Sequence, residues 1–250
     1  MRKKFLLTAI VSIVLFCACK KETEDFKSVP LSDYVPLQSG KYITYQLDSF
    51  RYLPQSLFSI ITSYQVKYLV DSAITDNIGR PGFRIIRYIR NNSSQPWQPE
   101  NTFQAINTGR SFEFVENNLR FVKLSLPLSN SFSWKGNSFI ATSSQSQDVD
   151  FRFYDNWDYV YDSINAPKTF GALSFDSTLK VDQRDEVIGN PDDPNSFSEK
   201  NMSLEYYAKG IGLVYKKFLH SEYQPPTTVG GSGFYSDATR GATYTIIDHN

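Results

Sequence analysis

Apolar and polar side chains alternate with a period of two along most of this chain. The alternation is clearest at residues 43–47, 64–71, 83–89 and 173–182. Successive side chains of a β-strand point to opposite faces of a sheet, so this period predicts strands. Shorter segments of the same kind lie at 112–114, 119–126, 204–208, 213–219 and 242–248, which brings the expected number of strands to about nine to eleven.

The polar stretches between these segments are typical of turns. Residues 76–79 (Asp-Asn-Ile-Gly) and 116–118 (Glu-Asn-Asn) each separate two alternating segments, and these residue types favour the backbone angles of tight turns. Short turns connect antiparallel strands. The sequence therefore predicts an all-β protein with a curved antiparallel sheet, either a half-barrel, a barrel or a sandwich. No helical period is visible, so few or no helices are expected apart from the N-terminal segment.

The first residues have the layout of an export signal. Three basic residues at positions 2–4 precede an apolar run over 5–18, which is shorter than the roughly 20 residues that a membrane-spanning helix needs. The open alternative is a short uncleaved anchor helix. We predict a signal peptide over 1–18, a polar flexible tether over 19–33, and a single antiparallel β domain over 34–250, because neither of the polar loops at 190–195 and 224–233 marks a clear boundary.

Two cysteines lie at the end of the apolar run, and Cys19 is the better candidate for lipid attachment. A cut before Cys19 leaves the small Ala18 at the cleavage position, whereas a cut before Cys17 leaves Phe16. The segment 15–19 (Leu-Phe-Cys-Ala-Cys) resembles a bacterial lipobox, with Phe16 where Leu is usual. The following segment 20–25 (Lys-Lys-Glu-Thr-Glu-Asp) resembles lipoproteins of the Bacteroidota. This resemblance implies a protein anchored by lipid to the bacterial outer membrane, with the periplasmic face and the cell surface as alternatives.

A second resemblance lies near the C-terminus. Residues 207–214 (Tyr-Ala-Lys-Gly-Ile-Gly-Leu-Val) are similar to a Tyr-Ala-x-Gly-Ile-Gly-Leu-Val motif of uncharacterised envelope lipoproteins. That resemblance implies a curved antiparallel sheet, in some members similar to the half-barrel carriers that shuttle lipoproteins, and it implies no particular activity. Gly210 and Gly212 would allow the chain to turn sharply at a corner of the sheet.

Charge and cysteine content exclude several classes of function. The full chain has 26 basic and 26 acidic residues, and removal of a signal peptide with three basic residues leaves 23 against 26. Without a basic excess, nucleic acid is not an expected partner. Once Cys17 is removed and Cys19 is acylated no thiol is left, so disulfides, thiolate nucleophiles and cysteine metal sites are not expected.

No constellation of catalytic residues stands out. The two histidines, His220 and His249, are both expected at the surface, and neither a nucleophile elbow nor a phosphate loop is present. Acidic residues such as Asp182, Asp185 and Glu186 are expected to be solvated. We therefore predict that the protein is not an enzyme and holds no metal or cofactor. A hydrolase that uses loop carboxylates is the remote alternative.

Aromatic residues, at 15 % of the chain, are the remaining lead. The speculative ligand-binding residues are Trp97, Trp134, Trp157 and Tyr159. Aromatic rings stack on sugars, but they also fill the cores of all-β proteins. The leading hypothesis is a non-enzymatic, lipid-anchored envelope protein that binds an apolar or amphiphilic ligand or a partner protein. The alternative is a surface glycan-binding module.

Overall fold

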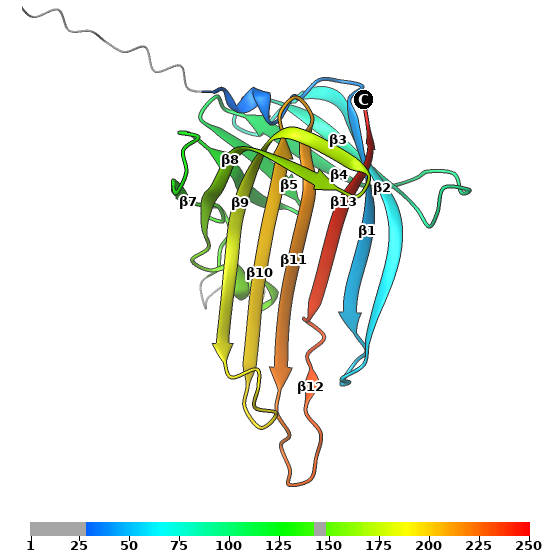
Figure 1. Ribbon diagram of the computed structural model, residues 1–250, viewed down its shortest axis with the longest axis vertical. Coiled ribbons are helices and arrows are strands. Elements are labelled where there is room, and N and C mark those ends of the chain that lie inside the picture. Colours follow the sequence, from blue (N-terminus) through cyan, green and yellow to red (C-terminus); the bar gives the residue numbers. More distant parts are fainter. Residues whose placement is uncertain (1–28, 143–148) are drawn as a thin grey trace, which may run out of the picture.

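A computed structural model describes residues 29–142 and 149–250, and within these ranges it confirms the all-β prediction (Figure 1). The described residues contain thirteen strands, two 3-10 helices and no α-helix. The elements are η1 (Leu31–Asp33), β1 (Tyr42–Tyr52), β2 (Ser59–Thr75), β3 (Pro81–Arg90), β4 (Gln98–Asn107), β5 (Ser111–Glu116), β6 (Leu119–Ser125), β7 (Ser133–Lys135), η2 (Val149–Tyr154), β8 (Asp158–Phe170), β9 (Leu173–Gly189), β10 (Ser198–Ala208), β11 (Gly212–Gln224), β12 (Phe234–Tyr235) and β13 (Arg240–His249). No helix in these two ranges has the length and apolar character to cross a membrane.

All strands belong to one antiparallel sheet that curls into a nearly closed barrel. The order is β6-β5-β4-β3-β2-β1-β13-β11-β10-β9-β8-β7, and β12 pairs with β11 beside this path. The two ends of the sheet meet where the Val122 amide donates to the Gly136 carbonyl at 2.8 Å and the Trp134 indole donates to the Val122 carbonyl at 2.7 Å. Of the three predicted arrangements, the structure therefore shows a barrel rather than a sandwich.

The turns follow from the residues that the sequence places there. Asn117 and Asn118 have φ of 51° and 61°, and they join β5 to β6 in a tight turn as predicted. Gly210 and Gly212, with φ of 77° and 116°, reverse the chain between β10 and β11. These left-handed angles favour glycine over residues that carry a Cβ.

The barrel has an upper end, which carries η1 and the end of β13, and a lower end to which β2 and β9 extend (Figure 1). β3 pairs with β2 only from Gln65 upwards, and β8 pairs with β9 only as far as Asp182. Residues 59–64 of β2 and 183–189 of β9 are therefore free sheet edges. The β9 edge carries Arg184, Asp185 and Glu186, whereas residues 57–64 carry no charge.

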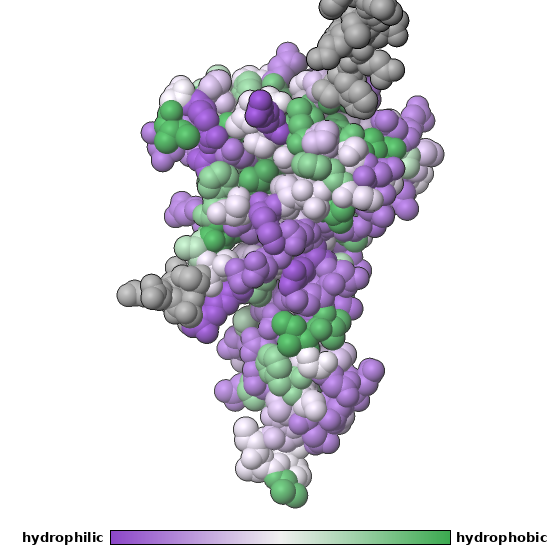
Figure 2. Space-filling model, turned by 90° about the vertical axis from the view of Figure 1, so that its left-hand side faces the viewer, coloured by the Kyte–Doolittle hydropathy of each residue, from purple (hydrophilic) through white to green (hydrophobic). Residues whose placement is uncertain are grey.

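Apolar side chains are exposed at the lower end. On the face seen in Figure 2, hydrophobic surface lies towards this end, below a band that is largely hydrophilic. The exposed apolar side chains of the lower strand ends and loops are Leu53, Leu57, Phe58, Ile61, Val187, Ile188, Phe197 and Val229.

The packed part of the chain begins earlier than the predicted boundary at Tyr34. Leu31 in η1 is 2 % exposed and belongs to the main hydrophobic core, although it lies in the segment 19–33 that we predicted as a tether. The buried Tyr34 fixes this segment, because its hydroxyl donates to Asn165 Oδ1 at 2.7 Å. The predicted signal peptide, Cys19 and the rest of the tether up to residue 28 lie outside the described residues.

A second, smaller core forms where the β8–β9 hairpin meets its neighbours. Phe170 stacks on Tyr215 with ring centroids 4.7 Å apart and lies edge-on to Tyr206 at 5.0 Å. Phe170 and Phe175 are both buried in this core. The hairpin therefore covers aromatic side chains of β10 and β11 that would otherwise face solvent.

Candidate functional site

The main cavity lies inside the upper half of the barrel. Its empty space is about 970 Å³ when the open solvent at the mouth is counted. Apolar side chains from the N-terminal segment and from β1, β2, β3, β5 and β11 form most of its wall; they include Val35, Ile43, Val70, Ile85, Phe112 and Leu213.

Five charged side chains also line this cavity. One of them is Lys41, and we call the other four, Glu116, Lys123, Glu205 and Lys216, the charge cluster. They come from β5, β6, β10 and β11. Lys123 donates to Glu205 Oε1 at 2.8 Å, and the Tyr207 hydroxyl donates to Glu205 Oε2 at 2.7 Å. Glu205 and Lys123 are 1 % and 6 % exposed. A buried carboxylate is stable only when paired and hydrogen-bonded, and Glu205 satisfies both conditions.

The charges of the cluster are mutually stabilising. Burial alone would raise the pKa of Glu205, but Lys123 and Lys216 outweigh burial, so this pKa lies below its ordinary value. The pKa of Glu116 is lowered for the same reason, with Lys216 as the strongest favourable neighbour. Burial would lower the pKa of Lys216, but Glu116 and Glu205 raise it above its ordinary value. At neutral pH Glu116 and Glu205 are therefore carboxylates and Lys216 is an ammonium group.

Lys216 is the member of the cluster with the longest contacts. Its Nζ is 3.6 Å from Glu116 Oε1 and 4.0 Å from Glu205 Oε1. It also lies 5.7 Å from the ring centroid of Tyr244, which lines the cavity too. An ammonium group has three N–H donors, so Lys216 can donate to an acceptor in the cavity as well as pair with these glutamates.

The two ends of the cavity differ. At the upper end its lining includes Lys41, Asn250 and the turn 210–212, and the exposure of Gly210 and Asn250 places the mouth there. Below the charge cluster, aromatic side chains of η2 and its surroundings close the barrel, with Tyr154 edge-on to Phe121 at 5.5 Å and to Trp157 at 5.2 Å. A ligand would therefore enter from the upper end.

The predicted ligand-binding residues do not line this cavity. Trp157 and Tyr159 are 2 % and 1 % exposed; the Trp157 indole donates to the Phe153 carbonyl, and the Tyr159 hydroxyl donates to Asn137 Oδ1. The structure brings Trp134 and Tyr159 together, with ring centroids 5.8 Å apart. All three belong to or pack against the main core.

Trp97 lies apart from the other three, beside Lys67 and Arg90, whose charged groups are 4.9 and 4.1 Å from its ring centroid. The four aromatic candidates therefore share no groove among the described residues. Binding of glycans by these aromatic residues stays a prediction.

His220 is not at the surface as we expected. It is 4 % exposed, its ring stacks on Phe153 with centroids 4.1 Å apart, and its Nδ1 lies 2.8 Å from Asn201 Oδ1. Inward-pointing positions of β11 alternate with outward ones, and η2 covers this position from inside the barrel.

The acids considered for hydrolysis have cationic neighbours: Asp182 pairs with Lys180 at 2.9 Å, and Glu186 pairs with Arg184.

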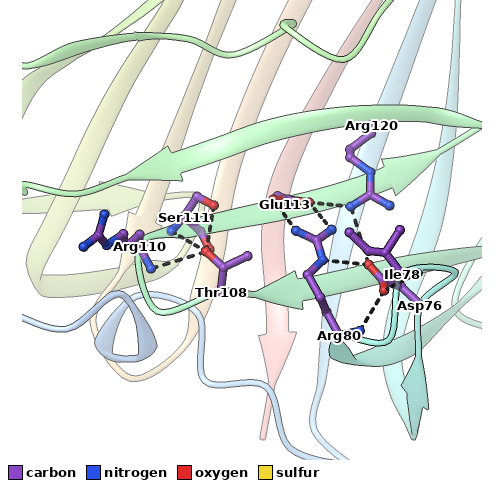
Figure 3. Close-up of polar contacts among 8 residues, drawn as sticks. All are labelled: Asp76, Ile78, Arg80, Thr108, Arg110, Ser111, Glu113 and Arg120. Carbon is purple, nitrogen blue, oxygen red and sulfur yellow. Dashed lines mark hydrogen bonds and ion pairs between the residues drawn. The ribbon is translucent and has the colours of Figure 1, made fainter.

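A second group of charges lies on another part of the barrel wall (Figure 3). Arg80 donates to both carboxylate oxygens of Glu113, at 3.0 and 2.8 Å, and to Asp76 at 2.9 Å, while Arg120 pairs with Glu113. Asp76 also accepts from the amides of Ile78 and Arg80 within its own turn. This group joins the β2–β3 turn to the β5–β6 hairpin, and its two acids and two arginines are satisfied by one another, so we interpret it as structural.

In the two described ranges, no group of three or more His, Cys, Asp or Glu side chains is arranged to hold a metal ion. Comparison of the chain with protein-family models, with curated proteins and with solved structures finds no match. The interpretation of function therefore depends on the cavity and on the N-terminal sequence.

Proposed function

We propose that this protein is a non-enzymatic, lipid-anchored envelope protein that binds a small amphiphilic molecule inside its barrel. The observation that carries the proposal is one cavity with apolar walls and a charge cluster at its inner end. An amphiphile matches this arrangement, because its chain can replace water along the apolar wall while its head contacts the cluster.

The position of the mouth supports membrane association. The helix η1, which follows the first described residues, lies in the upper part of the molecule (Figure 1). The residues that line the cavity begin at Val35, directly after it. Nine residues lie between Cys19 and Val29, and a chain of this length spans at most about 35 Å. A lipid on Cys19 would thus hold the mouth close to the membrane surface, where amphiphiles are concentrated.

The anchor can be tested separately from the cavity. Cys19→Ser should abolish labelling by a fatty-acid precursor in cells and leave the chain uncleaved, because the acylated residue is gone. Cys17→Ser is the matched control, and it should be labelled like the wild type. Labelling of the Cys19→Ser variant would overturn the assignment of the anchor.

Ligand binding can be tested with N-phenyl-1-naphthylamine, an uncharged dye whose fluorescence rises in apolar sites. The wild type should bind it with saturation. Ile43→Trp adds bulk at the cavity wall near the mouth and should weaken binding by at least about tenfold. Gln46→Trp, on the same strand but not part of the cavity lining, is the matched control and should bind normally. No saturable binding, or equal effects of both variants, would refute the proposal.

A further inference from the structure

The charge cluster is electrically balanced. It contains two lysines and two glutamates. Arg87, whose charge helps to lower the pKa of Glu116, is paired too, since its Nε donates to Glu100 at 2.6 Å and its Nη1 donates to the Tyr68 hydroxyl at 3.3 Å. The inner end of the cavity therefore has no net charge to neutralise that of a ligand.

The register of the strands places this cluster below the apolar wall. Glu205 and Lys216 are direct cross-strand partners, and Tyr207 pairs with Leu213 nearer the upper turn. On the opposite wall, Phe112 and Phe114 precede Glu116 along β5, which runs from the upper end downwards. Beyond Lys41 at the mouth, a molecule that enters from the upper end meets apolar side chains first and the charge cluster last.

This order decides which end of an amphiphile goes in first. An alkyl chain placed on the cluster would cover Lys216 and Glu116, whose side chains are 19 % and 21 % exposed, and offer no hydrogen bond in return, which is costly. A polar head placed there would replace the lost water and leave the chain against the apolar wall. The head group therefore meets Lys216, Glu116 and Glu205.

A charged head would be poorly matched to these three groups. A carboxylate attracted to Lys216 would also approach Glu116 and Glu205, whose oxygens lie 3.6 and 4.0 Å from the same ammonium. An alkylammonium would approach the glutamates and be repelled by the lysines. A hydroxyl or primary amide can accept from Lys216 and donate to a glutamate, and it adds no net charge.

We infer that the cavity selects an uncharged amphiphile, one whose head carries hydroxyl or amide groups, over fatty-acid anions and alkylammonium ions of the same length. This inference rests on the proposed function, and it names the class of ligand.

The test compares 1-decanol, decanoate and decylammonium as competitors of N-phenyl-1-naphthylamine on the full chain at pH 7. These molecules have the same chain length and differ in the head. The alcohol should displace the dye at least about tenfold more tightly than either ion. Equal or tighter binding of an ion would overturn the inference while leaving the proposed function intact. Failure of the dye itself to bind would instead refute the proposed function.

Single-charge variants give a second readout. Glu116→Gln leaves the cluster with one excess positive charge and should shift the preference towards decanoate by at least about tenfold, while Lys216→Gln should shift it towards decylammonium. If both shifts are absent although the variants fold and bind the dye, the head does not contact the cluster and the inference is wrong. Lys41→Met tests the other orientation of the ligand. If the wild type binds decanoate tightly and this variant does not, the head lies at the mouth and the inference is wrong.

Discussion

Replacement of Glu205 by Gln tests whether the charge cluster is held in a largely dry interior. Glu205 is 1 % exposed, its two oxygens accept from Lys123 and Tyr207 at 2.8 and 2.7 Å, and Lys216 lies 4.0 Å away. The variant has almost the same shape but leaves two lysines with one carboxylate. Breaking a buried ion pair by removal of one partner costs about 3–5 kcal/mol. For a domain of this size, that corresponds to a fall in Tm of roughly 6–20 °C.

The matched control is Asp158→Asn, which removes one partner of the Lys135–Asp158 pair, with side chains 55 % and 59 % exposed. An exposed pair of this kind contributes about 0–1 kcal/mol. Both variants should be compared with the wild type by thermal and urea unfolding. If Glu205→Gln is no more destabilising than Asp158→Asn, the cluster is solvated like a surface pair, and the reasoning about the cavity is refuted.

Three further predictions follow from particular contacts. Acidification should destabilise the protein: the pKa values of Glu116 and Glu205 are lowered in the folded state, so the stability they contribute is present above their ordinary value of 4.5 and is lost as the pH falls through the folded values. Tm measured against pH should show this loss, and Glu205→Gln should lose less than the wild type on the same titration; an unchanged slope would contradict the assignment. Gly136→Ala should cost about 1–3 kcal/mol, since a Cβ there would lie 2.4 Å from the Tyr159 ring. Ser138→Ala, at an exposed position nearby, is the control, and equal Tm values would show that the contact can relax. Finally, the uncharged β2 edge predicts self-association at high concentration, because free edges without charges can pair with other strands. Ile61→Lys, at a side chain 68 % exposed, should reduce it in light scattering, whereas Val187→Lys on the already charged β9 edge should not.

Much of the sheet could be predicted from local pattern. The alternation at 43–47, 64–71, 83–89 and 173–182 falls within β1, β2, β3 and β9, and the Asn117-Asn118 turn lies where its residues require it. The sequence did not reveal β4 and β8 as strands. β4 begins with Gln98 and Pro99, and most of its apolar residues come only at its end, while β8 contains Asn165, with φ of 60°, and several register shifts that interrupt the alternation.

The candidate site was missed because alternation identifies two faces of a strand but not which face points inward. In β10 the apolar set, Leu204 and Tyr206, is only half-buried, whereas Glu205 and Tyr207 point into the barrel. A rule that turns the apolar face to the core would place Glu205 outside. Tyr206 is instead covered from outside by Phe170 of the β8–β9 hairpin. A local pattern cannot show that a distant hairpin supplies a second core.

The same arrangement explains how a barrel can have charges in its interior. The cluster consists of two pairs that are far apart in the sequence: Glu116 and Lys123 in β5 and β6, and Glu205 and Lys216 in β10 and β11. Only closure of the sheet between β6 and β7 brings the two pairs opposite each other. Each charge alone would be too costly to bury, so the four are favourable only as a set. A purely apolar interior would stabilise the barrel at least as well, because replacement of buried ion pairs by apolar groups is often neutral or stabilising. The stability of the fold thus does not explain a balanced polar group at the inner end of this cavity, whereas a ligand of the proposed kind would explain it.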